Sequence, residues 1–161
     1  MIEQRADLWD IGATCDATCI TTNGTITGRG LGVMGRGCAL EAAERYNTQR
    51  AFRRSAGHRL TGSLQRLLGN YLKQHGNHVG VLLPPPPVTL VVFPVKHEWH
   101  EQADLTLIKR SCLELAKLAD DHGWRRVVLP RPGCGNGGLT WDVVGPVIDA
   151  YLGERFVVVT K

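Results

Sequence analysis

The sequence lacks the hydrophobic segments that mark secreted and membrane-spanning proteins. No stretch approaches the about 18 uninterrupted apolar residues that suggest a membrane-spanning helix. Residues 1–5 do not begin an apolar signal core. The sequence therefore predicts neither secretion nor a membrane partner.

Cysteine pairs in CxxC spacing are also absent. The five cysteines are an odd number, and most of them lie in apolar or helical surroundings. They are Cys15, Cys19, Cys38, Cys112 and Cys134. We expect all five to be reduced, in a cytoplasmic protein.

Two nucleotide-binding fingerprints are incomplete. Residues 30–35 match the letters GxGxxG, but the dinucleotide fingerprint needs an acidic residue about 20 positions later, and residues 53–55 carry none. The P-loop needs a lysine where Arg36 follows Gly35. We therefore expect neither a Rossmann dinucleotide site nor a P-loop.

A complete metal-ligand motif is missing as well. His97 and His100 stand three residues apart, which is not the HExxH spacing, and no cysteine pair completes a ligand set. No segment has the nucleophile-elbow pattern of serine hydrolases. We expect no metal and no cofactor.

The composition is that of a globular domain. The chain has 161 residues, of which 43% are hydrophobic and 21% charged, so residues 1–161 are predicted to form one domain with its own core. The net charge of +4 suits a phosphate-bearing ligand but falls short of a dedicated nucleic-acid binder. One segment is rich in arginine and forms either a solvated face or a nucleic-acid footprint. Its arginines are Arg45, Arg50, Arg53, Arg54, Arg59 and Arg66.

Strand and helix patterns alternate along the chain. Short apolar runs predict strands at 17–22, 79–83, 88–93, 126–129 and 156–159. Helical spacing of apolar residues, or a run of strong helix formers, predicts helices at 38–46, 60–72, 105–119 and 141–152, with stops near Gly76 and at His122-Gly123. This alternation indicates an α/β domain with a parallel or mixed sheet.

Two glycine-rich loops each lead into a predicted helix. One spans residues 24–37, and the other contains Gly133, Gly135, Gly137 and Gly138. Glycine lets backbone amides approach an anion closely, and a helix N-terminus adds positive potential. Although such a loop can be a plain connection, the clustering favours a ligand site at the carboxyl ends of the strands.

Lys96 follows a predicted strand at the same edge of the sheet. Lysines at strand ends are usually solvated. In a partly closed pocket, however, a lysine can act as a nucleophile or as a donor toward a sugar or phosphate.

Four segments in this order resemble a macrodomain: residues 6–10, 33–40, 93–99 and 129–135. The resemblance is to the branch that contains the terminal ADP-ribose glycohydrolase and the DNA-ADP-ribosyl glycohydrolase antitoxin DarG. It implies a three-layer α/β/α sandwich with a mixed, largely parallel sheet, which binds ADP-ribose along one edge.

The resemblance also implies roles for individual residues. Asp7 would accept a hydrogen bond from the adenine amino group with Leu8 beside the ring, and Thr21 and Asn23 would face the distal ribose. Lys96 would be catalytic. Two loops would clasp the diphosphate and distal ribose with Val33, Met34, Gly35, Arg36, Gly37, Pro130, Pro132, Gly133, Cys134, Gly135, Asn136, Gly137 and Gly138.

The chain departs from this pattern at Gly137, where the protein-directed glycohydrolase of the branch carries a catalytic aspartate. DarG-like members have a similar Asn-Gly-Gly loop. The general acid or base is therefore open, with Asp142 and His97 as candidates.

The resemblance implies removal of ADP-ribose from a protein carboxylate or a nucleic-acid base. The alternatives are a non-catalytic ADP-ribose reader and a phosphatase acting on ADP-ribose 1″-phosphate, and the oligomeric state stays open, with a monomer as one option.

Overall fold

The computed structural model describes residues 1–46 and 63–161. Within these ranges the helices and strands alternate as the sequence patterns predict. Most of the arginine-rich segment and the predicted start of the helix at 60 lie outside the described residues. The arginines concerned are Arg50, Arg53, Arg54 and Arg59.

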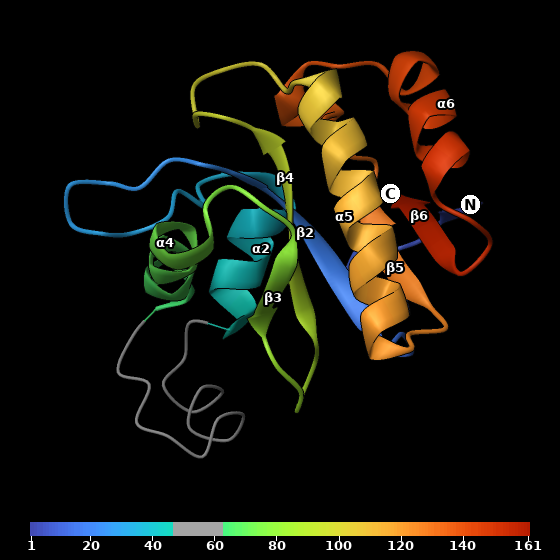
Figure 1. Cartoon of the computed structure of the whole chain (residues 1–161), viewed down its shortest axis with the longest axis horizontal. Helices are drawn as coiled ribbons and strands as arrows, with labels where there is room; N and C mark the ends of the chain where they lie inside the picture. Colours follow the sequence, from blue (N-terminus) through green and yellow to red (C-terminus); the bar gives the residue numbers. More distant parts are fainter. Residues whose placement is uncertain (47–62) are drawn as a thin grey trace.

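The strands form one six-stranded sheet in the order β1-β6-β5-β2-β4-β3 (Figure 1). The strands are β1 (Ile2–Arg5), β2 (Ala17–Asn23), β3 (Gly80–Leu83), β4 (Leu90–Lys96), β5 (Val127–Pro130) and β6 (Phe156–Thr160). Only β3 runs antiparallel to its neighbour, and all the other pairs are parallel. The sheet is therefore mixed and largely parallel, as expected.

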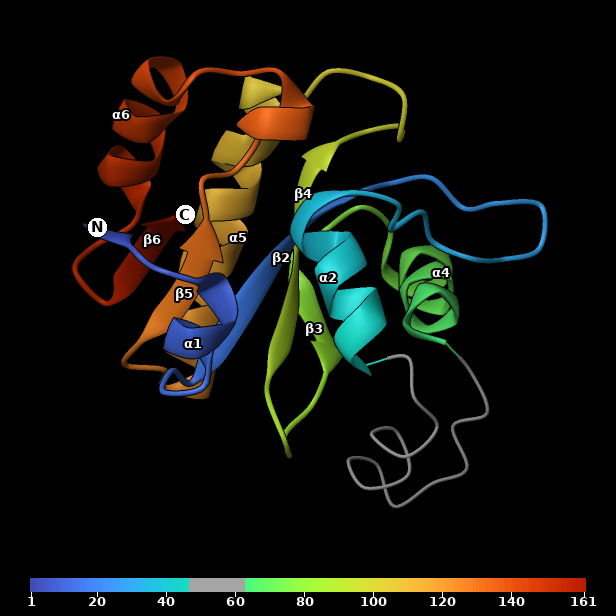
Figure 2. The ribbon, with the colours of Figure 1, turned by 180° about the vertical axis from the view of Figure 1, so that it is seen from behind.

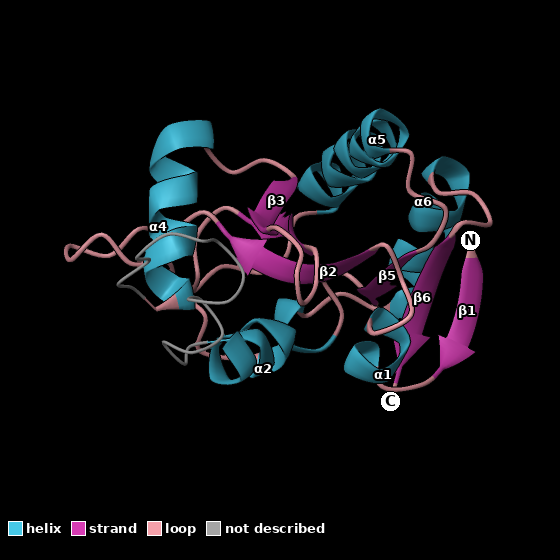
Figure 3. Ribbon diagram, turned by 90° about the horizontal axis from the view of Figure 1, so that it is seen from below, coloured by secondary structure: helices cyan, strands magenta, loops and turns pink. Residues whose placement is uncertain are grey.

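Helices cover both faces of this sheet (Figure 3). They are α1 (Leu8–Gly12), α2 (Gly37–Tyr46), α4 (Leu64–His75), α5 (Leu105–His122) and α6 (Trp141–Tyr151), with a 3-10 turn η1 (Gly135–Gly137). Helices α1, α2 and α4 pack into one hydrophobic cluster, and α5 and α6 pack into a second one on the opposite face. The molecule is an α/β/α sandwich, which confirms the predicted fold class.

Strand β4 contributes side chains to both hydrophobic clusters. Leu90 and Val92 face the cluster of α1, α2 and α4, whereas Val91, Phe93 and Val95 face the cluster of α5 and α6. This alternation follows from the two-residue period of a strand, and a strand buried on both faces reads as a continuous apolar run.

Local signals explain the ends of the helices. Asp104 caps α5 by accepting a hydrogen bond from the Thr106 N–H (2.9 Å), and Gly123 ends it with φ 67° in the left-handed region. Helix α4 likewise ends at Gly76, and α6 continues through Pro146. The predicted stops at Gly76 and at His122-Gly123 are confirmed, so α4 and α5 each run three residues beyond the last apolar positions of their patterns, 72 and 119.

Strand β1 and helix α1 were not anticipated from the sequence. All four residues of β1 are exposed, so the strand has no hydrophobic alternation to reveal it, and it is held by parallel pairing with β6. Strand β4 also extends three residues beyond the predicted end at 93 and brings Lys96 onto the strand end itself.

The five cysteines all lie within the described ranges, and each is a free thiol. No helix among the described residues is long and apolar enough to cross a membrane.

A close approach of backbone to backbone makes Gly69 of α4 sensitive to substitution. A Cβ at Gly69 would overlap the carbonyl oxygen of Gly30 and lie 3.1 Å from the Gly32 nitrogen. We expect Gly69→Ala to lower the free energy of unfolding by about 1–3 kcal/mol, the usual cost of overpacking. Urea denaturation measures this, with Gly28→Ala as the matched control, because a Cβ at Gly28 would meet no atom within 4 Å. Equal stability of the two variants would contradict the proposed close packing.

Candidate functional site

The parallel strands end at one edge of the sheet, and the residues singled out from the sequence follow those ends. Asp7 comes shortly after β1, Asn23 ends β2, Lys96 ends β4 and Pro130 ends β5. In Figures 1 and 2 the loops that leave β4 and β5 rise from the same end of the sheet. Carboxyl ends of parallel strands are the usual ligand edge of an α/β sheet.

The two glycine-rich loops meet at Asn136. A Cβ on Gly37, at the start of α2, would lie 3.4 Å from Nδ2 of Asn136. The Lys96 ammonium donates a hydrogen bond to the Asn136 carbonyl oxygen (3.1 Å). Lys96 therefore reaches the loop that follows β5 directly, and the structure brings these three predicted site residues together.

The second glycine loop, residues 133–138, has a backbone that favours glycine. Gly133, Gly135 and Gly138 have φ angles of 75°, 74° and 77°. The Leu139 N–H donates to the Gly133 carbonyl (3.0 Å), so the loop folds back on itself before α6. A tight turn of this kind exposes backbone N–H groups toward one side, as anion-binding loops do.

The segment after β4 holds the second glycine loop from outside. The Ala103 N–H donates to the Gly137 carbonyl (2.9 Å), and the Gln102 side chain donates to the Gly138 carbonyl (3.2 Å). A Cβ at Gly137 would lie 2.9 Å from that of Ala103. The glycine found at 137, in place of an aspartate, therefore packs directly against the neighbouring loop.

Thr21 and Asn23 brace the first glycine loop. The Asn23 side chain donates to the Val33 carbonyl (3.1 Å) and accepts from the Thr25 N–H (3.1 Å). The Thr21 hydroxyl lies 3.2 Å from the Cys38 sulfur. In this structure Asn23 positions the loop backbone, whereas Thr21 contacts a side chain in the first turn of α2, and the contact of both residues with a ribose stays a prediction.

Within the first loop, Met34 is buried in the core, whereas Gly35 and Arg36 are exposed. The Arg36 carbonyl accepts the Leu40 N–H (3.3 Å), so Arg36 stands at the entrance of α2. The N–H groups of the first turn of α2 have no intrahelical acceptor, which leaves positive potential beside the loop.

Asp7 caps α1, with one oxygen accepting from the Trp9 N–H (2.8 Å) and the Asp10 N–H (3.3 Å). Its other oxygen lies 3.9 Å from the Lys161 ammonium. Leu8 is only 3% exposed and belongs to the core. The cap thus uses one Asp7 oxygen, the other faces Lys161, and the roles of Asp7 and Leu8 at the adenine stay predictions.

Sequence reasoning missed the polar neighbours of Asp7. Glu41 of α2 accepts hydrogen bonds from the Trp9 indole (2.7 Å) and from Lys161 (2.8 Å). The hydrogen bond from Lys161 lowers the pKa of Glu41. These residues are far apart in the chain, so only the fold could reveal them.

Asn77 was also missed, and it fixes the backbone of Lys96. Its side chain donates to the Lys96 carbonyl (3.0 Å), and the Arg110 guanidinium donates to the Asn77 carbonyl. The Gly24 N–H donates to the next carbonyl, that of His97 (2.9 Å). The end of β4 is thus held on both sides, which restricts the directions in which the lysine can point.

The two candidate acid–base residues do not contact Lys96. The His97 ring lies 2.7 Å from a carboxylate oxygen of Asp104, and this hydrogen bond lowers the pKa of Asp104. Asp142 is exposed in the first turn of α6. Of these three residues, Lys96 is therefore the one whose side chain contacts the second glycine loop.

The two cysteines at the site are poor nucleophiles. Burial raises the pKa values of the Cys38 and Cys134 thiols, and the thiolate is the reactive form. No group of three or more histidine, cysteine or acidic side chains that could hold a metal occurs among the described residues.

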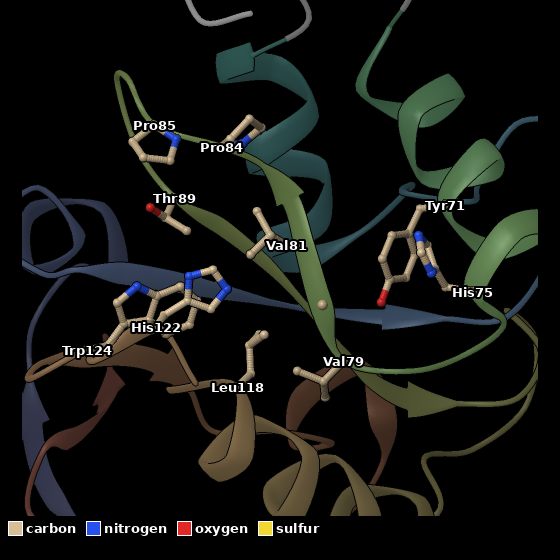
Figure 4. Close-up of a pocket in the computed structure, with 11 residues that line it drawn as sticks. Tyr71, His75, Val79, Val81, Pro84, Pro85, Thr89, Leu118, His122 and Trp124 are labelled. Atoms are coloured by element: carbon tan, nitrogen blue, oxygen red, sulfur yellow. The ribbon is translucent and has the colours of Figure 1, made fainter. Parts of the chain in front are cut away.

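A hollow of about 440 Å³ lies elsewhere, over strand β3 (Figure 4). Tyr71 and His75 flank it on the side of α4, and Leu118, His122 and Trp124 flank it on the other side. None of the residues predicted to bind a ligand lines this hollow.

Two solved structures have the same fold. The macrodomain of Mycobacterium tuberculosis DarG aligns with a TM-score of 0.69 and 22% identity, covering 99% of this chain and 97% of the other. Thermosipho africanus DarTG in complex with ADP-ribose aligns with a TM-score of 0.65 and 19% identity, covering 95% of this chain and 39% of the other.

Comparison of amino-acid sequences finds relatives of the same kind. A DNA ADP-ribosyl glycohydrolase of Mycobacterium tuberculosis (strain ATCC 25618 / H37Rv) is 27% identical over 122 residues. The match covers 75% of this chain and 32% of the relative, so the chain spans about a third of the relative's length. The family model of the Macro domain matches residues 37–148, well over half of the chain. This chain belongs to the macrodomain family.

Proposed function

We propose that the chain binds ADP-ribose between its two glycine loops and hydrolyses the bond that joins it to a nucleic-acid base. The observation that carries this proposal is the position of Lys96, whose ammonium lies 3.1 Å from the carbonyl oxygen of Asn136 in the second glycine loop. The names of the relatives, a DNA ADP-ribosyl glycohydrolase and a DarTG complex with ADP-ribose, support the choice of ligand and substrate.

The arrangement suggests how the ligand lies. The backbone N–H groups of the loops and of the first turn of α2 would surround the diphosphate. The distal ribose would then lie at Lys96, beside Asn23, and the adenine at Asp7. In this orientation the Asp7 oxygen that does not cap α1, and that lies 3.9 Å from the Lys161 ammonium, would accept a hydrogen bond from the adenine amino group.

In the proposed reaction a water oxygen bonds to C1″ of the distal ribose while the bond from C1″ to the base nitrogen breaks. The base leaves with a proton, and free ADP-ribose is the second product. Lys96 is the donor that the structure offers for the distal ribose, its hydroxyls or the leaving group, because its ammonium already donates to an uncharged oxygen.

A non-catalytic reader is the second candidate. It is favoured by Gly137, which leaves no carboxylate in the second loop, and by the separation of His97 and Asp142 from the lysine. A reader would bind ADP-ribose with the same loops, so binding alone does not distinguish the two functions.

The distinguishing experiment offers ADP-ribosylated DNA and ADP-ribosylated protein side by side, at two salt concentrations. We expect free ADP-ribose to be released from the DNA. Release from the protein alone would redirect the proposal to a carboxylate linkage, and binding without release would establish the reader. Phosphate release from ADP-ribose 1″-phosphate would identify a phosphatase.

We further propose that residues 1–161 act as one domain, in the cytoplasm. The five free thiols support this location, because reducing compartments keep cysteines unpaired.

A further inference from the structure

The exposed indole of Trp99 is the feature on which this inference rests. Trp99 is 56% exposed, the highest exposure of a large hydrophobic side chain among the described residues. It lies three residues after Lys96, in the loop between β4 and α5. In Figure 1 this loop rises above the sheet. A single exposed hydrophobic side chain is ordinary on a protein surface, but an indole beside the proposed ligand site offers a flat aromatic ring on which a ligand group can stack.

The backbone beneath this indole is firmly held. The Trp99 N–H donates to the Thr25 hydroxyl (2.9 Å), and this hydroxyl donates to the Glu98 carboxylate (2.5 Å). Farther along the loop, the Ala103 N–H bonds to the second glycine loop. The exposure of the ring is therefore built into a braced loop.

The same contacts place Trp99 at the distal-ribose end of the proposed ADP-ribose site. Thr25, which binds the Trp99 N–H, also donates its own N–H to Asn23, the residue that braces the first glycine loop. On the other side, Lys96 reaches Asn136. The macromolecule attached to C1″ would leave the site at this end.

Trp99 also differs from the other three tryptophans, because each of those carries a cation or a stacked ring over its indole. An arginine lies over the ring of Trp9 and another over that of Trp141. His122 stacks on Trp124 at an interplanar angle of 18°. Trp99 makes a T-shaped contact with His100, at 75°, and within the described ranges no cation or parallel ring lies over it.

We infer that Trp99 is a stacking platform for an unpaired nucleobase next to the ADP-ribosylated base, so that single-stranded DNA is the preferred substrate. This inference rests on the proposed function. Every nucleobase has a flat face that stacks on an aromatic ring, whereas in a duplex both faces are already covered. A side-chain carboxylate of a modified protein offers no such face.

The charge of the loop that carries Trp99 favours stacking over phosphate binding as its contribution. Residues 96–101 contain one lysine, two histidines and two glutamates, so this loop is not a basic groove for phosphates. Stacking does not release counterions. The contribution of Trp99 to binding should therefore be nearly the same at low and high salt.

The first test measures binding without any reaction. The intact chain is titrated with an unmodified single-stranded oligonucleotide while tryptophan fluorescence is recorded. The same oligonucleotide with abasic residues and the matching duplex are titrated in parallel. We expect quenching by the single strand, weaker binding of the other two, and loss of the quenching in Trp99→Ala at both salt concentrations.

The second test measures turnover. For ADP-ribosylated single-stranded DNA we expect Trp99→Ala to lower kcat/KM about 5- to 150-fold, which corresponds to about 1–3 kcal/mol at 1.36 kcal/mol per factor of ten. Trp99→Phe should restore most of it. An ADP-ribosylated nucleoside, which has no neighbouring base, should be cleaved equally by the Trp99→Ala and unmodified chains, and calorimetry should show unchanged affinity for ADP-ribose.

Leu113→Ala is the matched control, because Leu113 is 54% exposed on α5 and should affect neither test. Equal losses on the nucleoside and the DNA, or equal binding of the abasic strand, would overturn the inference. If the chain released ADP-ribose from no substrate, the proposed function would fail, whereas the fluorescence titration would still decide whether Trp99 stacks on bases.

Discussion

Replacing Lys96 by alanine is expected to lower kcat for release of ADP-ribose from ADP-ribosylated DNA by about 100- to 10,000-fold, the range typical of a positioned proton-transferring side chain. The physical reason is that the Lys96 ammonium lies at the second glycine loop, 3.1 Å from the Asn136 carbonyl oxygen, at the proposed position of the distal ribose. Neither His97 nor Asp142 contacts it to take its place. Quantifying released ADP-ribose under single-turnover conditions measures the effect.

Affinity separates a catalytic role from a purely structural one. The backbone N–H groups that would hold the diphosphate remain in Lys96→Ala, so the dissociation constant of ADP-ribose should change little. Lys117→Ala is the matched control, because Lys117 is an exposed lysine of α5 that pairs with Asp121 (2.7 Å). Full turnover of Lys96→Ala on both DNA and protein substrates would remove Lys96 from the mechanism.

Gly133→Ala is expected to weaken ADP-ribose binding by at least about tenfold, which corresponds to about 1.4 kcal/mol. Gly133 has a φ of 75°, and its Cβ would lie 2.7 Å from Cδ1 of Ile108 and 3.1 Å from the Cβ of Ala103. Left-handed backbone costs an alanine about 1–2 kcal/mol. Because Ile108 is fully buried, the strain is relieved by moving the loop, which displaces the N–H groups of residues 134–138. Isothermal titration with ADP-ribose measures the loss.

Gly123→Ala provides the control for the backbone conformation alone. Gly123 has a φ of 67°, and a Cβ there would meet no atom within 4 Å. It ends α5, outside both glycine loops. This variant should lose stability but keep its affinity for ADP-ribose, and an equal loss of affinity in the two variants would mean that the crowding at Gly133 is unimportant.

The parts of the fold that could be predicted are those that depend on residues close together in the sequence. The apolar period and the Gly123 stop predicted α5 from its first residue, and the alternation of apolar runs with helical segments predicted the α/β class. The same holds for the glycine loops, because clustered glycines show directly where the backbone can adopt positive φ and approach a ligand.

What could not be predicted depends on contacts between distant parts of the chain. Strand β1 is exposed along its whole length and exists because β6 pairs with it. The hydrogen bonds of Lys96 with Asn77 and Asn136 join residues 19 and 40 positions apart. The family resemblance implied the position of Lys96, but only the fold shows what holds the lysine there.

Asn136 has a mechanical consequence for the site. Its carbonyl receives the Lys96 ammonium, while its amide group faces Gly37 at the start of α2. A molecule that enters between the loops and pushes this residue aside must disturb both partners at once. Displacement of Asn136 would therefore separate the Lys96 ammonium from its acceptor and the amide group from Gly37 in the same step.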